Sequence, residues 1–280
     1  MIITTAVGPA RVVHRLALGV EVVDARTGRL VGAALRVGRQ VPGGGAEPGW
    51  PCQDLEYAAP GRYRQRQVPG LPASVVIRID DPTRFFAPRR FEVTLWPLAD
   101  LERADATPPT GPYVPVGSRL LRPWLTPGSA CALPRGSTAV RGRVVRDGSP
   151  VRWPRIVAFG AGGARVGWAH GDDRGEFLLV VTGPGRLPPP VDDPVELEME
   201  ITAFPTGQAP ARDPADRLAD LVVERVPRST VPPTPADLDN PQLRGLARPP
   251  GHVASATGRH HLTVPVGTSL TVPDDLPFVG

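Results

Sequence analysis

The sequence predicts an all-β fold of two tandem β-sandwich domains, with one short helix in a proline-rich insertion. Three observations support this prediction. The 37 prolines and 31 glycines among 280 residues interrupt nearly every stretch that could form a long helix. A hydrophobic content of 41% is still enough apolar surface to bury a core. An internal sequence repeat indicates that this core is divided between two domains.

The first copy of the repeat opens with a predicted β-hairpin. Alternating apolar residues over positions 22–37 run into a turn at Gly28 and out again. The elements expected after it are turns at Pro60-Gly61 and Pro69-Gly70, a strand over residues 75–79 and the closing segment Val114-Pro-Val-Gly117-Ser. We assign residues 1–125 to the first domain.

The second copy presents the same features in the same order. Its hairpin is expected over residues 144–157. The elements expected after it are turns at Arg174-Gly175 and Pro184-Gly185, a strand over residues 195–201 and the closing segment Val264-Pro-Val-Gly267-Thr. The strand over 195–201 alternates strictly between apolar and acidic residues, as a half-buried strand does. We assign residues 126–137 to a linker and residues 138–280 to the second domain.

A proline-rich insertion, residues 205–259, separates the last two strands of the second copy. Residues 213–226 inside it are the best candidate for a helix, because Asp213 is a good N-cap and Pro214 suits the first turn. At helical spacing the segment carries one apolar stripe, formed by Leu218, Leu221, Val222 and Val226. A short helix of this kind must dock on something, either its own sheet or another subunit.

The repeat motifs resemble the carboxypeptidase regulatory-like domain. The residues that carry the resemblance are Val22, Val23, Asp24, Thr27, Gly28, Val31, Ala34 and Leu35, followed in the second copy by Asp172, Asp173, Gly175 and Phe177. The similarity covers roughly residues 12–97 and 138–204. The first copy departs from the pattern at Ala58-Ala-Pro-Gly61, which replaces the acidic turn. The resemblance implies a small transthyretin-like or Ig-like β-sandwich without catalytic activity, which adds stability, spacing or contact surface.

The arrangement as a whole is also similar to small proteins encoded with bacterial contractile injection systems, which are phage-tail-like particles assembled in the cytoplasm. The shared features are two such domains, a proline-rich insertion, no signal peptide and a composition rich in arginine without lysine. This resemblance implies a structural protein of a bacterium, a cap or adaptor that works through protein–protein contacts.

Several enzyme classes are excluded by the residues that are missing. All 32 basic residues are arginine, so neither a Schiff-base lysine nor a phosphate-loop lysine exists. The Gly-x-Ser-x-Gly motif of hydrolases is absent. Cys52 and Cys131 fit neither a disulfide framework nor a zinc site. We therefore expect no enzymatic activity, no cofactor and no catalytic or metal-binding residues.

The histidines and paired aspartates leave an alternative open. His170 with Asp172 or Asp173 and one member of the pair His260-His261 could bind a metal ion if the hairpins converge. The doubled acids at residues 80–81, 172–173 and 192–193 instead favour turns, where aspartate bonds its own backbone.

We expect the partners to be other protein subunits of a larger assembly. The net charge of +4 is small and the arginines are scattered, which speaks against nucleic acid. No apolar run reaches the roughly 20 residues of a membrane span, and the first residues lack a signal peptide, which predicts a cytoplasmic protein. The residues predicted to contact partners are Trp50 in a glycine-rich loop and Leu218, Leu221, Val222 and Val226.

The alternative function is a carbohydrate-binding β-sandwich module. Exposed tryptophan faces stack on sugars in many such modules. The chain has five candidates for that role, Trp50, Trp96, Trp124, Trp153 and Trp168. Sandwich ends or the contact between the two domains are the other places where these side chains could lie.

Overall fold

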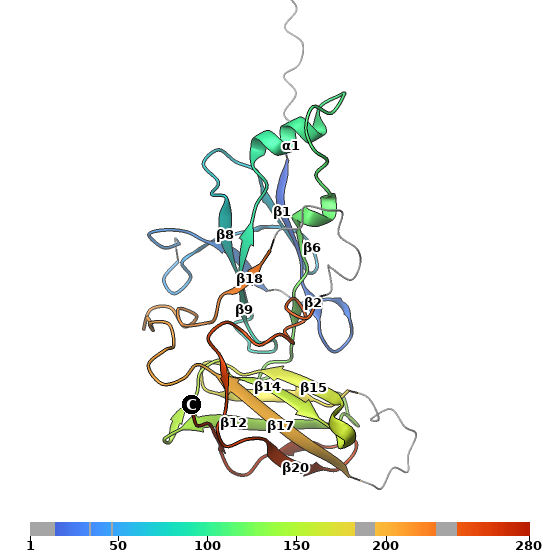
Figure 1. Cartoon of the computed structure of the whole chain (residues 1–280), viewed down its shortest axis with the longest axis vertical. Helices are drawn as coiled ribbons and strands as arrows, with labels where there is room; N and C mark the ends of the chain where they lie inside the picture. The colour runs from blue at the N-terminus through green and yellow to red at the C-terminus, as the bar shows by residue number, and fades with distance from the viewer. Residues whose placement is uncertain (1–14, 34, 46, 183–193, 228–239) are drawn as a thin grey trace, which may run out of the picture.

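The computed structural model describes residues 15–33, 35–45, 47–182, 194–227 and 240–280. Strands make up most of its regular structure, and the described residues contain one α-helix, so the all-β class is confirmed. The first half of the chain and the second half lie one above the other (Figure 1). The Pro184-Gly185 turn and the acids at 192–193 lie outside the described residues.

The strands of the first half are β1 (Leu16–Glu21), β2 (Val23–Asp24), β3 (Arg29–Leu30), β4 (Arg36–Gln40), β5 (Cys52–Asp54), β6 (Glu56–Ala59), β7 (Arg62–Arg66), β8 (Ser74–Asp80), β9 (Arg89–Thr94), β10 (Leu120–Leu121) and β11 (Trp124–Leu125). Helix α1 (Leu98–Asp105) and the 3-10 helix η1 (Val116–Arg119) follow β9.

The strands of the second half are β12 (Ala139–Arg146), β13 (Ser149–Pro150), β14 (Arg155–Phe159), β15 (Arg165–His170), β16 (Glu176–Val180), β17 (Val195–Ala203), β18 (Glu224–Val226), β19 (Val253–Ala254), β20 (His260–Val264), β21 (Ser269–Thr271) and β22 (Leu276–Pro277). A second 3-10 helix, η2 (Ala161–Gly163), connects β14 and β15.

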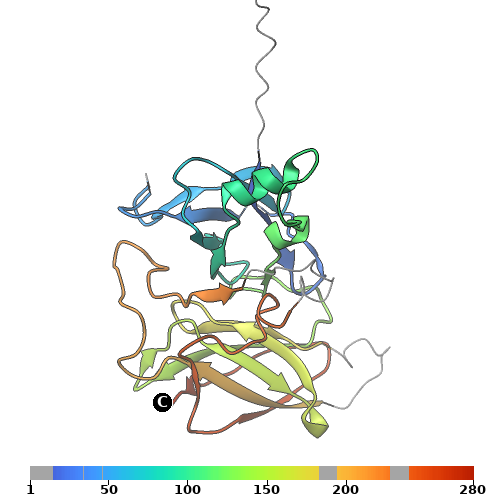
Figure 2. The same cartoon turned by 45° about the horizontal axis from the view of Figure 1, so that its top comes forward.

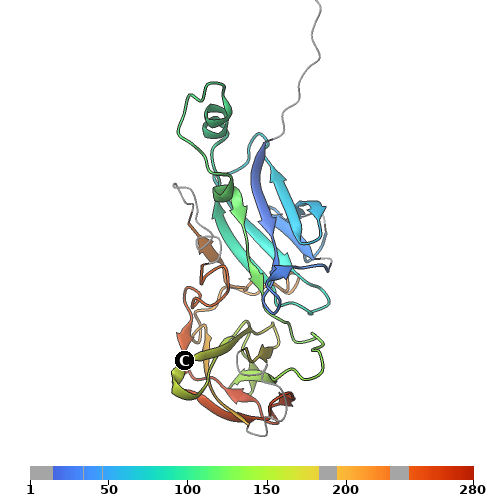
Figure 3. The same ribbon diagram turned by 90° about the vertical axis from the view of Figure 1, so that its right-hand side faces the viewer.

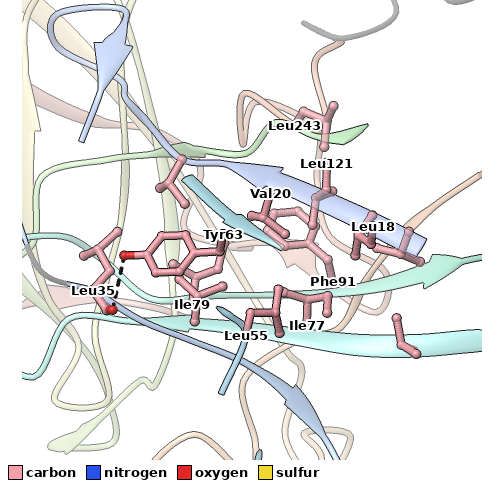
Figure 4. Packing of buried hydrophobic residues seen from close by; sticks show 14 of the residues in the cluster. Leu18, Val20, Leu35, Leu55, Tyr63, Ile77, Ile79, Phe91, Leu121 and Leu243 are labelled. Atoms are coloured by element: carbon pink, nitrogen blue, oxygen red, sulfur yellow. Dashed lines mark hydrogen bonds between the residues drawn. The ribbon is translucent and has the colours of Figure 1, made fainter. Parts of the chain in front are cut away.

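The first half buries its core between two sheets. One sheet has the order β10-β1-β7-β6, and the other has the order β18-β9-β8-β4-β5. The strands β11-β2-β3 form a small third sheet, in which β2 and β11 follow β1 and β10 along the chain. Leu18 and Val20 of β1 meet Ile77 of β8 and Phe91 of β9 in one apolar cluster (Figure 4). The hydroxyl of Tyr63 donates to the carbonyl of Leu35 at 3.3 Å, which satisfies the only polar atom of that side chain.

The second half repeats this pairing order. β12 pairs antiparallel with β16 and parallel with β21 and β22, as β1 pairs antiparallel with β7 and parallel with β10. In the opposite sheet β15-β14-β17-β20 matches β5-β4-β8-β9. Both sheets of the second half contribute to one buried cluster of their own. The two halves therefore share one strand arrangement.

The repeated sequence motifs occupy matching positions in this arrangement. The Val22 amide donates to the Gly61 carbonyl at 2.8 Å, and the Val144 amide donates to the Gly175 carbonyl at 2.9 Å. Both glycines have φ near +70°, and a Cβ on Gly175 would lie 2.5 Å from the Val144 oxygen. Glycine is thus required there by backbone conformation and by close approach. The predicted hairpins form only in part: β2–β3 and β12–β13 each pair over two residue pairs. The residues that follow enter β4 and β14 of the opposite sheet.

The two closing segments also form the same turn. Ser118 and Thr268 each donate from their backbone amide and from their hydroxyl to the carbonyl of the preceding Pro115 or Pro265. Each turn then leads into a short strand parallel to the first strand of its half. The proline ends any longer strand here, because it cannot donate to a ladder.

The predicted helix over residues 213–226 is wrong. Asp213 accepts a hydrogen bond from the Ala215 amide at 2.8 Å, and Asp216 accepts one from the Leu218 amide at 3.0 Å. These carboxylates stabilise consecutive turns in place of a helix. The segment then extends into β18, which pairs parallel with β9 of the first half. Figure 2 shows β18, in orange, between the two halves.

The α-helix of the structure lies elsewhere. Helix α1 follows Trp96-Pro97 and lies at the end of the first half that is remote from the second half (Figure 3). Leu101 is buried against Trp96 and Val114 in a small separate cluster. The sequence signals for it are Pro97 before its first turn, Asp100 in that turn and Arg103 in the last one.

Candidate functional site: a buried charged seam between the two halves

Four of the five residues predicted to contact partners are buried in this chain, namely Trp50, Leu218, Leu221 and Val222. Trp50, Leu218 and Leu221 form one buried cluster with Cys52 and Trp153. Trp50 is only 3% exposed, although it lies in the glycine-rich loop that we predicted as an external contact. This cluster joins a loop of the first half, the insertion and the second half. These side chains thus hold parts of this chain together.

The other two predicted contact residues lie just before β18 and at its end. Val222 is buried, and Val226 in β18 packs partly buried against the core of the first half. Glu224 lies between them and points inward with them, because side chains two apart share one face of a strand. The insertion thus brings a carboxylate into the interior.

Glu224 bridges an arginine from each half. Arg89 of β9 reaches it through Nε at 3.0 Å and Nη2 at 2.6 Å, and Arg155 of β14 reaches it through Nη2 at 3.0 Å. Arg89 is 0% exposed and Glu224 is 2% exposed. We refer to this three-residue contact as the seam.

The remaining donors of Arg89 are also used. Its guanidinium donates to the carbonyl oxygens of Trp124 at 3.0 Å, Gln242 at 2.6 Å and Leu243. With the two bonds to Glu224, these contacts occupy the five N–H groups that an arginine carries. Since Gln242 and Leu243 belong to the insertion, Arg89 fixes the insertion at two separate points.

The electrostatics of the seam favour the ionised form of Glu224. Burial by itself would raise the pKa of Glu224, but Arg89 and Arg155 outweigh burial and hold that pKa below its usual value. Burial lowers the pKa of the Arg155 guanidinium to about 10, an effect that Glu224 only partly offsets. Breaking such a pair would leave a buried charge without a partner, which is costly.

Two buried histidines adjoin the seam as neutral rings. Burial holds the pKa of His170 well below 6.5, and the positive charges of Arg155 and Arg89 add to this effect. His170 donates from Nε2 to the Gly245 carbonyl at 2.9 Å. Burial likewise lowers the pKa of His252 to about 3. The structure thus places His170 near two arginines, with Nε2 held by a backbone carbonyl.

Further ion pairs extend the contact between the halves. Arg84 of the first half reaches both Asp172 and Asp173 of the second half at 2.7 Å. Within the insertion, Asp216 pairs with Arg78 of β8 at 2.6 Å, and Asp220 pairs with Arg152 of the second half at 2.5 Å. The insertion therefore forms ion pairs with both halves, through Asp216 to the first and through Asp220 to the second.

The doubled acids at 172–173 and 80–81 form turns as well as ion pairs. Asp172 accepts hydrogen bonds from the Arg174 amide at 2.8 Å and the Glu176 amide at 3.1 Å. Asp81 accepts one from the Thr83 amide at 2.9 Å. These contacts are the local backbone bonds expected of aspartate in turns. Within the described ranges, no group of three or more His, Cys, Asp or Glu side chains is arranged to hold a metal ion.

None of the five tryptophans is fully exposed. Trp50, Trp96 and Trp153 are buried, and Trp124 and Trp168 are partly buried. The indole Nε1 of Trp153 donates to Asp220 at 2.7 Å, so its polar edge is held at the insertion. Of the tryptophans that the carbohydrate-binding alternative would use, only Trp124 and Trp168 remain in partial contact with solvent.

Sequence reasoning missed the charged residues of the seam. Arg89 could have been found from its strand, because it is in phase with the buried Phe91 and Val93. Glu224 is likewise in phase with Val222 and Val226. A charged residue at an inward position indicates a buried partner of opposite charge. The identity of that partner could not be predicted from the sequence, because 135 residues separate Arg89 from Glu224.

Comparisons with known proteins do not assign the chain to a family. No protein-family model matches the sequence, and no curated protein matches it. A leucine-rich repeat protein from Bacteroides thetaiotaomicron aligns in structure with 95% of this chain at 11% identity and a TM-score of 0.22. The alignment spans 27% of that protein's chain. Among the described residues, no helix has the length and apolar character needed to cross a membrane.

Proposed function

We propose that this protein is a non-enzymatic structural adaptor that holds other protein subunits at a fixed spacing in a larger assembly. The single observation that carries the proposal is Glu224, buried between Arg89 of one half and Arg155 of the other. Ordinary contacts between domains of one chain permit relative motion. A shift here would separate buried charges from their partner, so the two halves resist it.

The repeated strand arrangement supports the more specific reading of the two halves as tandem carboxypeptidase regulatory-like domains with Ig-like or transthyretin-like β-sandwich folds. The matching hydrogen bonds at Gly61 and Gly175 support a duplication of one ancestral unit. Domains of that type serve as spacers and contact modules. The assembly that the sequence resemblance favours is a contractile injection system, with this protein as its cap.

The first test measures rigidity. Spin labels are attached at Val68→Cys in the first half and Val279→Cys in the second, both exposed positions, while the native Cys52 and Cys131 are buried. Pulsed electron resonance should give one narrow distance distribution. Glu224→Gln should broaden it, whereas Glu92→Gln, which removes an exposed partner of Arg225, should not. A broad distribution in the unsubstituted protein would contradict the rigid spacer.

The second test measures assembly. In the cells that make the protein, a tagged chain should sediment with a multi-subunit particle at a constant ratio to the other subunits. The Glu224→Gln chain should be depleted from that particle relative to Glu92→Gln. Sedimentation as free monomer while the particle is present would overturn the adaptor function.

A further inference from the structure

The outer face of the sheet β10-β1-β7-β6 contains a hollow of about 490 Å³. Tyr63 of β7 points into the core, so its neighbours Arg62 and Arg64 take the opposite face, and Arg66 follows in the same phase. These three arginines and Arg15 line the hollow. Its rim is therefore built from guanidinium groups.

The floor of the hollow is aliphatic. Gly19 of β1 lies between Arg64 on β7 and Leu120 on β10 in the strand register. Because glycine has no side chain, the sheet is open at this point. A Cβ placed on Gly19 would lie 3.4 Å from Leu120 Cδ1 and 3.7 Å from Leu16 Cδ2. An apolar side chain entering the hollow would thus meet two leucines.

The rim already binds carboxylates of its own chain. Arg66 holds Glu56 through Nε at 2.7 Å and Nη2 at 2.9 Å, a two-point contact, and Arg64 also donates to Glu56. The hydrogen bonds from Arg64 and Arg66 lower the pKa of Glu56 to about 2. Arg62 donates to Glu21 at 2.9 Å. This face therefore favours ionised carboxylates in the planar, paired geometry that arginine prefers.

These contacts are exposed and so can be exchanged. The side chains of Arg64, Arg66 and Glu56 are 43%, 36% and 40% exposed. Exposed ion pairs contribute little to folding stability, so a partner carboxylate can replace an internal one at small cost. Glu21 is the one acid among the residues that line the hollow, and Arg15 pairs with Glu102 and Asp105 outside it, at 3.6 and 3.2 Å. An incoming carboxylate would therefore bind by exchanging with one of these exposed internal partners.

We propose that this hollow binds an extended acidic segment of a partner protein, with an aliphatic side chain over Gly19 and flanking carboxylates paired with the arginines of β7. This inference rests on the proposed adaptor function and names the chemistry of one partner. Charge complementarity selects the acidic residues. The leucine floor selects the aliphatic residue between them.

Other occupants fit less well. Nucleic acid bound without base pairing usually stacks on exposed aromatic rings, and the one aromatic residue lining the hollow, Tyr63, is buried. Residues 1–14 of this chain contain no aspartate or glutamate and include Arg11, so their charge is not complementary. A second copy of the chain would bring its own positive net charge.

The test uses the full-length protein and a fluorescein-labelled peptide, Glu-Glu-Leu-Glu-Glu, followed by fluorescence anisotropy. Binding should weaken when salt is added. It should also weaken when the peptide's glutamates are replaced by glutamine, or its leucine by serine. A labelled oligothymidylate serves as the nucleic-acid probe.

Two variants of the protein distinguish the contribution of the rim charges to peptide binding from that of the open space over Gly19. Arg62→Gln with Arg66→Gln removes rim charge, and we expect about tenfold weaker peptide binding. Gly19→Val fills the hollow but keeps every arginine, and valine suits a strand. We expect a similar loss of about tenfold, because the leucine loses its site. Arg143→Gln, which removes an exposed partner of Asp275 in the second half, is the matched control and should bind as the unsubstituted protein does. Thermal melting confirms that each variant is folded.

Several outcomes would overturn the proposal. These are equal binding of the glutamate and glutamine peptides, equal loss in Arg143→Gln, or unchanged binding in Gly19→Val. Oligothymidylate binding that the hollow variants abolish would assign the surface to nucleic acid instead. Peptide binding that appears only after removal of residues 1–14 would identify the chain's own N-terminus as occupant. Dimerisation lost in Gly19→Val would identify a second copy. All these results leave the rigidity and assembly tests of the adaptor function unaffected.

Discussion

Arginine–glutamate contacts occur in two regions of this molecule with opposite physical consequences. At the seam, Arg89 and Glu224 are 0% and 2% exposed, and every donor of the arginine is used. On the outer face of β7, Arg66 makes a similar two-point contact with Glu56, but both side chains remain in contact with water. The two pairs therefore have nearly the same hydrogen-bond geometry, but only the Arg89–Glu224 pair is buried.

Burial decides whether an arginine–glutamate pair stabilises the fold or is available for recognition. A buried pair has given up its hydration, so neither member can leave without a large cost. An exposed pair keeps most of its hydration, so either member can exchange its partner at small cost. The seam is thus suited to fixing the two halves, and the β7 face is suited to meeting another molecule.

The largest expected effect comes from removing the carboxylate of the seam. Glu224→Gln leaves Arg89 and Arg155 buried without a counter-charge, and we expect the free energy of unfolding to fall by about 3–5 kcal/mol. Urea denaturation followed by tryptophan fluorescence measures this change. Glu92→Gln, whose partner Arg225 is exposed, should change the free energy of unfolding by less than about 1 kcal/mol. Equal effects of the two variants would contradict the contrast between the regions.

The next effect is a loss of stability in mild acid. His170 and His252 are held neutral in the folded protein, with the pKa of His252 lowered to about 3 and that of His170 well below 6.5. As pH falls below 6.5, the unfolded chain binds protons that the folded chain cannot. The free energy of unfolding should therefore fall by about 1.4 kcal/mol per pH unit for each histidine. Above pH 7 this contribution is fully present.

Denaturation between about pH 7 and pH 5 isolates the histidines, because the lowered pKa of Glu224 adds its own loss only below about 4.5. His252→Leu should reduce the pH dependence of the free energy of unfolding by about 1.4 kcal/mol per pH unit, which corresponds to one proton. His261→Leu, which changes a side chain that is 73% exposed, should retain the slope of the unsubstituted protein. A slope that neither buried histidine changes would show that the acid sensitivity has another source.

The sequence predicted those parts of the fold that depend on local patterns. The hairpins at β2–β3 and β12–β13 follow from alternating apolar residues around a turn glycine. The structure of the insertion could not be predicted from its local pattern. Its apolar stripe does become buried, at Leu218 and Leu221, but the aspartates at 213 and 216 bond neighbouring amides and replace the helix with turns.

The candidate site was less predictable than the fold. Trp50 was selected because tryptophan in a glycine-rich loop often anchors a partner, yet its indole donates to Asp54 at 2.6 Å and packs inside the chain. The seam depends on contacts between residues far apart in sequence, which local patterns do not contain. The arginines of β7 were visible as an alternating series, but their hollow depends on Gly19 in a neighbouring strand.

The smallest expected effect is on the exposed face. Arg62 pairs with Glu21 at 2.9 Å while its side chain is 54% exposed. Arg62→Gln should therefore change the free energy of unfolding by less than about 1 kcal/mol, and added salt should shrink the difference further because it screens exposed charges. Urea denaturation at low and high salt measures both. A loss as large as that of Glu224→Gln would show that this face stabilises the fold, and it would remove the reason for treating its arginines as free to change partners.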